Sequence, residues 1–336
     1  MTFGWVRQAV VVTGLLALAG FSGCKCNRTD AAAAAKKQAV GDKAQFVEFP
    51  SGSLQLTGYV TKPTGNGPFP LIIYNHGSEQ KPNPTPEYAP YFASKGYAVL
   101  LPFRRGHGGS KGRHYKTAVA GLPPKERGPA IVKELEAQVD DVAAALEYAK
   151  KQPWVDPDRI VVMGCSNGGI EALFAAEKPL GFKAAIDFGG GADMWHSNPG
   201  LRDRMKQAAE HATIPVFLLQ AENDYNTGPN KELGAAMDAA NKPHQMKIYP
   251  AFGGGRKDGH GGFCAQGKAR WGDDVMAFIE ASLKGQAPPG GSAAAPVAPV
   301  GSASAGASAA PAASAAPAAS AAPSASAKAP PAPGKP

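Results

Sequence analysis

The stretch RIVVMGCSNGGIEALFAAEK, residues 159–178, decides the fold that we expect for this chain. Four apolar residues that favour β-structure, Ile160 to Met163, lead into the turn Gly-Cys-Ser-Asn-Gly-Gly, and a segment with helical periodicity follows at once. A strand, a sharp turn and a helix in this order are typical of a nucleophile elbow. Glycines on both sides allow Ser166 a tight backbone geometry, which would present its hydroxyl at the end of a sheet.

The G-x-S-x-G string is weak by itself, because the chain contains 41 glycines and such a string arises easily by chance. The apolar strand before it and the alanine-rich helix after it are the surroundings that the motif requires. We therefore interpret Ser166 as the candidate nucleophile.

Strand-like and helix-like segments alternate from residue 45 onward. The expected strands are an antiparallel hairpin over 45–61 and single runs at 70–74, 97–103, 160–163, 183–191, 214–220 and 244–250. The expected helices are 86–96, 131–151, the one that follows the elbow, 201–209, 229–240 and 268–284. This alternation predicts an α/β fold with a mostly parallel sheet, covered by helices on both faces and edged by the hairpin.

The first 43 residues have the pattern of a targeting segment and a tether. Residues 1–23 combine Arg7 with a short apolar run, which indicates a signal peptide. The end of this run, Phe21-Ser22-Gly23-Cys24, resembles a bacterial lipoprotein box, so we expect lipidation at Cys24 and a polar tether over 24–43. The expected location is the bacterial cell envelope, with ordinary cleavage and secretion as the alternative.

Residues 44–284 are predicted to form one domain, because this length supports a sizeable core. Residues 285–336 are almost entirely Ala, Pro, Ser and Gly, a composition that favours a disordered spacer. Most of the net charge of +8 arises outside the expected domain, which carries 27 basic and 25 acidic side chains. This balance argues against nucleic acid as a partner.

A serine nucleophile needs a base, and the base needs a carboxylate that orients it. The elbow architecture predicts the chain order Ser, Asp, His. Asp224 lies in the loop after strand 214–220, where the carboxylate belongs. Glu222 is the competing residue, and we favour Asp224 because the loop resembles the G-x-x-D of hydrolases, with Ala221 in the glycine position.

His260 is the predicted base, because it lies in the glycine-rich loop GGGRKDGHGGF after the last strand. His244 precedes a strand and so lies at its wrong end, and His211 lies in or at the end of a helix. His196 lies in residues 192–213, which either cover the active site or form an ordinary connecting helix.

Two backbone amides are expected to form an oxyanion hole, namely those of Asn167, after the nucleophile, and of Ser78, in the loop after strand 70–74. His76 is expected to organise that loop. The glycine-rich residues 104–112 lack the further features of a phosphate-binding loop. None of the four cysteines has the spacing of a zinc site. Cys165 and Cys264 could be neighbours in space, but we expect buried free thiols.

Several of these motifs together resemble the α/β-hydrolase superfamily, and within it the dienelactone hydrolase-like branch. They are the His-Gly-Ser loop at 76–78, GCSNGG at 164–169, Glu-Asn-Asp at 222–224, and HGGF followed by W-x-x-D-V-x-x-F from Trp271 to Phe278. The resemblance implies an eight-stranded sheet and an enzyme without metal or cofactor. The founding members of the branch use a cysteine nucleophile, whereas here Ser166 holds that place, so an ester or acyl hydrolase is the safer inference.

The expected activity is hydrolysis of carboxylic esters or related acyl bonds in a small-molecule substrate, through an acyl-enzyme on Ser166. The first alternative is a peptidase of the prolyl-oligopeptidase kind, which shares the fold and the triad. The second is an envelope-anchored binding protein without catalysis, which the presence of all three triad residue types argues against.

Overall fold

The computed structural model describes Met1 and residues 44–289. The predicted signal peptide, the Cys24 lipidation site and the tether at 24–43 lie outside the described residues, as does most of the predicted tail. No helix in the described part is both long and apolar enough to cross a membrane.

Eight strands form a single sheet, which confirms the predicted number. In chain order they are β1 (Gln45–Ser51), β2 (Leu54–Thr61), β3 (Phe69–Asn75), β4 (Ala98–Phe103), β5 (Val155–Cys165), β6 (Ala185–Phe188), β7 (Val216–Ala221) and β8 (His244–Tyr249). Their order across the sheet is β1-β2-β4-β3-β5-β6-β7-β8. β2 pairs antiparallel with β1 and β4, and every other pair is parallel, so the sheet is mostly parallel with a hairpin at one edge.

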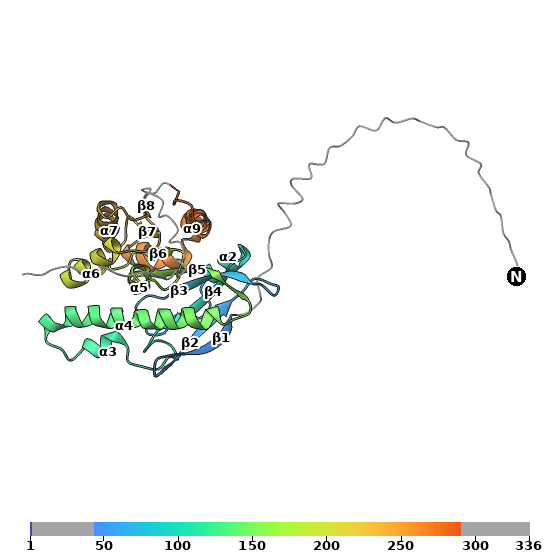
Figure 1. Cartoon of the computed structure of the whole chain (residues 1–336), viewed down its shortest axis with the longest axis horizontal. Helices are drawn as coiled ribbons and strands as arrows, with labels where there is room; N and C mark the ends of the chain where they lie inside the picture. Colours follow the sequence, from blue (N-terminus) through green and yellow to red (C-terminus); the bar gives the residue numbers. More distant parts are fainter. Residues whose placement is uncertain (2–43, 290–336) are drawn as a thin grey trace, which may run out of the picture. The chain divides into compact units, whose positions relative to one another are not determined.

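The helices between and after the strands cover both faces of the sheet (Figure 1). They are α2 (Tyr88–Ser94), α3 (Tyr115–Val119), α4 (Pro124–Lys150), α5 (Asn167–Glu177), α6 (Pro199–Glu210), α7 (Gly228–Ala239), the π-helix η1 (Asp258–Gly262), α8 (Phe263–Gln266) and α9 (Lys268–Leu283). One core forms where α4, α5, α6 and α7 pack on one face. The other core forms where α2, α8 and α9 pack on the opposite face, with Trp271 and Phe278 of α9 fully buried.

The strand order places two candidate site segments next to each other. β3 lies between β4 and β5, so the chain moves to one side of β3 with β4 and to the other side with β5. Ligand sites of open α/β sheets form at such a switch point, outside the carboxyl ends of the strands. The His76 loop follows β3 and Ser166 follows β5, so the two segments meet at this edge of the sheet.

α4 begins at Pro124, seven residues before the predicted helix start, and includes Pro129. Apolar periodicity marks only the part of a helix that is buried, and the first residues of α4 are mostly exposed and polar. The prediction therefore found the packed part of the helix and missed its solvated beginning. The short helix α3 was missed for its length, since five residues carry almost no periodic signal.

Residues 192–213 contain α6, whose residues Leu201 and Met205 are fully buried in the core on the α4–α7 face. α6 contacts α4, α5 and α7, which is the position of a connecting helix in a doubly wound fold. Of this segment, Asp193 alone is among the residues that line the cavity described below.

Candidate active site

The turn at Ser166 has the geometry of a nucleophile elbow. Ser166 has φ 57° and ψ −118°, and it joins the end of β5 to the start of α5. This conformation is costly for a residue with a side chain and is retained where the surrounding structure enforces it. Here the neighbours are glycines that allow close packing: a Cβ on Gly164 would overlap the carbonyl of Gly168, and a Cβ on Gly168 would overlap the carbonyl of Asn75.

The His76-Gly77-Ser78 loop lies directly beside the elbow. A Cβ placed on Gly77 would lie 3.6 Å from Ser166 Cβ and 3.7 Å from the carbonyl oxygen of Cys165. Asn167 is the first residue of α5, so its amide has no acceptor within the helix and points out of the helix end. The structure thus places Ser78 at the same cavity as Ser166, and Asn167 follows Ser166 directly at the start of α5.

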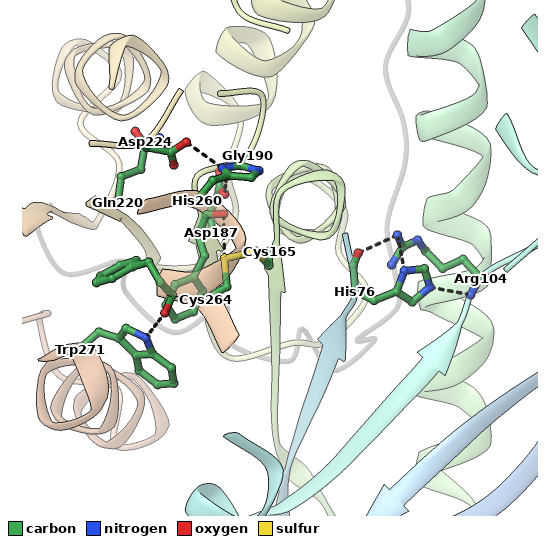
Figure 2. The surroundings of a disulfide bond; sticks show 12 residues. His76, Arg104, Cys165, Asp187, Gly190, Gln220, Asp224, His260, Cys264 and Trp271 are labelled. Atoms are coloured by element: carbon green, nitrogen blue, oxygen red, sulfur yellow. Dashed lines mark hydrogen bonds and ion pairs between the residues drawn. A yellow bond between two sulfur atoms is a disulfide. The ribbon is translucent and has the colours of Figure 1, made fainter. Parts of the chain in front are cut away.

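Asp224 and His260 lie in direct contact (Figure 2). His260 Nδ1 donates to Asp224 Oδ1 at 2.8 Å, and this carboxylate oxygen also accepts from the backbone N–H of Tyr225 at 2.5 Å. The second oxygen, Oδ2, accepts from Gln220 Nε2 at 3.0 Å. These bonds fix the carboxylate, and the bond to Nδ1 leaves His260 Nε2 as the ring nitrogen that can serve as a base.

Ser166 and His260 both line a cavity of about 460 Å³, a size typical of small-molecule sites. No hydrogen bond joins their side chains in this structure, and such contacts commonly tighten only when substrate binds. Burial alone would lower the pKa of His260. The hydrogen bond and charge of Asp224 outweigh burial, together with the charges of Asp193 and Asp187, so the pKa is raised above 6.5.

The other candidates for the orienting carboxylate and the base do not line this cavity. Glu222 is exposed, whereas Asp224 is only 7% exposed. His211 caps the end of α6 and bonds to its backbone, and His196 is exposed. His244 begins β8 at the edge of the sheet opposite Ser166, with Asp238 as its ionic neighbour.

The predicted loop around His260 is helical, which corrects the expectation of a flexible glycine-rich loop. Residues 258–266 form η1 and α8. A Cβ on Gly259 would overlap Asn223, whose side-chain amide donates to the carbonyls of Phe252 and Gly255 at 2.9 and 3.1 Å. At Gly259, glycine is therefore required for close packing, and the packing holds His260 in place.

Cys165 and Cys264 form a disulfide, which corrects the expectation of free thiols (Figure 2). The two Cα atoms lie 6.0 Å apart, although 99 positions separate the residues in sequence. Spacing along the chain carries no signal for such a bond, because it depends on how β5 and α8 pack against each other. The bond joins the residue before Ser166 to the turn of helix that follows His260.

Arg104, from the glycine-rich loop after β4, holds the His76-Gly77-Ser78 loop through hydrogen bonds to its backbone. Its guanidinium donates to the carbonyls of His76 and Gly77 at 2.8 and 3.0 Å and forms an ion pair of 2.6 Å with Glu171 of α5. Both charged side chains are fully buried. Burial, and then the charge of Arg104, lowers the pKa of His76 well below 6.5, so His76 is a neutral structural residue, as predicted for its role in the loop.

Asp187, at the end of β6, is a buried carboxyl that sequence reasoning missed. Its Oδ1 accepts from the backbone N–H of Gly190 at 2.7 Å, and burial raises its pKa to about 7. The signal was present in the sequence as an acidic residue within the apolar strand before Gly-Gly-Gly at 189–191. Nowhere in residues 44–289 do three or more His, Cys, Asp or Glu side chains form a cluster that could hold a metal ion.

Comparison with known proteins agrees with this architecture. A putative carboxymethylenebutenolidase of Aquifex aeolicus is 25% identical, over 54% of this chain and 71% of its own length. An uncharacterized peptidase of Bacillus subtilis, YtmA, is 28% identical, over 60% of this chain and 82% of its own length. The acylaminoacyl peptidase structure of Pyrococcus horikoshii is 20% identical, with a TM-score of 0.56, over 76% of this chain and 44% of its own; it shows the shared fold.

The chain spans between 41% and 71% of the lengths of the first curated relatives that it matches. The model of the family described as "Dienelactone hydrolase family" matches residues 56–271. This range runs from β2 to the start of α9 and includes the elbow, Asp224 and His260. The chain belongs to the dienelactone hydrolase family, a family with the α/β-hydrolase fold.

Proposed function

We propose that this chain is a serine hydrolase that cleaves carboxylic esters or related acyl bonds with Ser166 as nucleophile, His260 as base and Asp224 as its orienting carboxylate. The observation that carries the proposal is the 2.8 Å bond between Asp224 and His260 at the rim of the cavity that contains Ser166. Membership of a hydrolase family supports hydrolysis as the reaction class.

The proposed reaction begins when His260 Nε2 takes the proton of the Ser166 hydroxyl and the oxygen attacks the ester carbonyl. Charge then develops on the carbonyl oxygen, where the amides of Asn167 and Ser78 would donate to it. The tetrahedral intermediate collapses as His260 protonates the leaving alcohol, which gives an acyl-enzyme on Ser166. Water, deprotonated by His260, attacks the acyl-enzyme and releases the acid, and the proton returns to Ser166.

The test is replacement of Ser166 by Ala. A fluorophosphonate probe should label the native protein at Ser166, and turnover of p-nitrophenyl esters should fall by at least about 10³-fold in Ser166→Ala. The variant should keep the native melting temperature, since only one oxygen is lost. Undiminished turnover in a folded Ser166→Ala protein would refute the assignment, and absence of both labelling and turnover in the native protein would favour the binding-protein alternative.

A peptidase activity is the second candidate, because the relative YtmA is named a peptidase and spans the same domain. The chemistry at Ser166 would be the same, with an amine as the leaving group. Parallel assays of peptide amides and of esters with the same acyl group separate the two, since a peptidase would cleave the amides at a comparable rate.

We also propose export to the cell envelope and lipid anchoring at Cys24. The disulfide between Cys165 and Cys264 supports an oxidising compartment, where such bonds persist. Metabolic labelling with a radioactive fatty acid should mark the native protein and not Cys24→Ser. Labelling of both proteins, or of neither, would contradict the anchor at Cys24.

A further inference from the structure

Acidic side chains line the cavity at Ser166, and the basic residues in its lining are the histidines His76 and His260. Glu79, Glu87 and Asp193 line it, and no lysine or arginine is among its lining residues. Glu87 is paired with Lys268 at 2.8 Å. Within residues 44–289, no ion pair compensates Glu79 or Asp193, so two carboxylates face the cavity without a cation from the protein.

Glu79 is an exposed residue that lies beside the oxyanion loop. A single carbon added at Gly77 would lie 2.6 Å from Glu79 Oε2 and 3.6 Å from Ser166 Cβ. The Glu79 carboxylate and Ser166 therefore both lie beside Gly77 of the oxyanion loop. Asp193 approaches from the side of the base, where its charge is felt at His260.

Aromatic residues provide a second, independent feature. Tyr74 and Tyr88 are stacked with their ring centroids 3.8 Å apart, and Tyr225 lies 5.0 Å from the His260 ring, all three at the cavity. The faces of such rings attract cations. Tyr74 and Tyr88 cover part of each other's ring faces, whereas Tyr225 is 37% exposed, so its ring is open to a cation beside His260.

The two carboxylates oppose the reaction unless the substrate compensates them. Negative charge develops on the carbonyl oxygen as Ser166 attacks, and a neighbouring carboxylate raises the energy of that transition state. A cation on the substrate makes the electrostatic contribution to the transition state favourable, because it attracts both the carboxylate and the developing oxyanion. An anionic substrate would instead be repelled from the cavity.

We propose that this cavity selects acyl substrates that carry a protonated amine near the scissile carbonyl, as in aminoacyl esters and amides. The proposal rests on the serine hydrolase function proposed above and names its substrate class. The ammonium group is held by the carboxylates of Glu79 and Asp193, which line the cavity with Ser166. Substrates with a carboxylate near the carbonyl are disfavoured.

Three ethyl esters that share the β-alanine skeleton test the proposal. β-Alanine ethyl ester is cationic, its N-acetyl derivative is neutral, and its N-succinyl derivative is anionic. Hydrolysis at pH 7.5 is followed in a pH-stat, and each kcat/KM is divided by the rate of hydroxide-catalysed hydrolysis of the same ester. This division removes the intrinsic effect of the ammonium group on the carbonyl. We expect the normalised kcat/KM to fall in the order cationic, neutral, anionic, by about tenfold or more at each step.

The matched variants are Glu79→Gln, Asp193→Asn and the double variant, with Asp158→Asn as the control. Asp158 is an exposed carboxylate near the start of β5, at the end of the strand opposite to Ser166. The preference for the cationic over the neutral ester should fall about tenfold in Glu79→Gln and nearly vanish in the double variant. It should stay at the native value in Asp158→Asn, and 0.5 M NaCl (about 4 Å screening length) should weaken it in the native enzyme.

Equal normalised rates for the cationic and neutral esters would overturn the substrate class and leave the hydrolase function intact, provided that Ser166 is labelled. A cationic preference that persists in the double variant would overturn the role of the two carboxylates. If no ester is cleaved and Ser166 is not labelled, the proposed function fails, and this inference fails with it.

Discussion

The disulfide between Cys165 and Cys264 joins the residue before the candidate nucleophile to the helix that follows the candidate base. Ser166 follows strand β5 and His260 lies in η1 after strand β8, and these two strands are separated in the sheet by β6 and β7. Hydrogen bonds hold His260 to Asp224 of the β7 loop, and the disulfide alone ties its segment covalently to the elbow. The bond therefore restricts the distance between Ser166 and His260.

Reduction of the disulfide should lower both stability and catalysis. Opening a cross-link between residues so far apart in sequence should lower the free energy of unfolding by about 2–4 kcal/mol, because the unfolded chain regains freedom. The value of kcat should fall more than KM rises, because the alignment of Ser166 and His260 loosens. Melting curves and ester hydrolysis with and without dithiothreitol measure both effects.

The control for reduction is the double variant Cys165→Ala with Cys264→Ala. It should match the reduced native protein in melting temperature and should not respond to dithiothreitol. Full kcat in native protein whose two thiols have been shown by mass spectrometry to be alkylated would contradict the positioning role.

The glycine at 168 should not tolerate a methyl group. In Gly168→Ala the new Cβ would overlap the carbonyl of Asn75 and crowd that of His76, so the elbow and the oxyanion loop must move apart. We expect a loss of about 1–3 kcal/mol or more of stability, together with loss of fluorophosphonate labelling. Gly121→Ala is the matched control, because no atom lies within 4 Å of a Cβ there. A Gly168→Ala protein that melts and reacts like the native one would show that the elbow is looser than described.

The pH dependence of kcat/KM should reflect His260. Only the neutral imidazole can accept the Ser166 proton, so activity is lost as pH falls through the His260 pKa. Since Asp224 raises this pKa above 6.5 against the effect of burial, the acidic limb should lie above pH 6.5. Asp193 also raises this pKa, so Asp193→Asn should move the limb to lower pH, whereas Asp158→Asn should not. If the acidic limb of Asp193→Asn lies at the same pH as that of the native protein, Asp193 does not influence the His260 pKa.

The buried ion pair of Arg104 and Glu171 should tolerate loss of both charges better than loss of one. Arg104→Met leaves the fully buried Glu171 without its partner and removes the donor to the His76 and Gly77 carbonyls, so about 3–5 kcal/mol of stability should be lost. The double variant Arg104→Met with Glu171→Leu should recover part of this loss, because no buried charge remains. Urea unfolding of the three proteins tests the order. A double variant no more stable than Arg104→Met would show that the donated hydrogen bonds, and not the charge, dominate.

The sequence by itself determined the α/β fold, the elbow at Ser166 and the chain order of Ser166, Asp224 and His260. These are local signals: apolar runs of strand or helix period, glycines beside a serine, and acidic or histidine residues directly after strands. Each of these signals can be recognised in a single sequence, because it depends on residues that are close along the chain.

Only the tertiary structure decided which distant residues meet. The pairing of Cys165 with Cys264, the contact of Asp224 with His260, the buried Arg104–Glu171 pair and the acidic lining with Glu79 all depend on how the ends of different strands pack together. The helical turn at His260 was hidden for a related reason, because Gly259 signals flexibility in sequence but serves close contact with Asn223 in the fold. Periodicity reports which face of an element is buried, whereas the partners on that face are fixed by long-range packing.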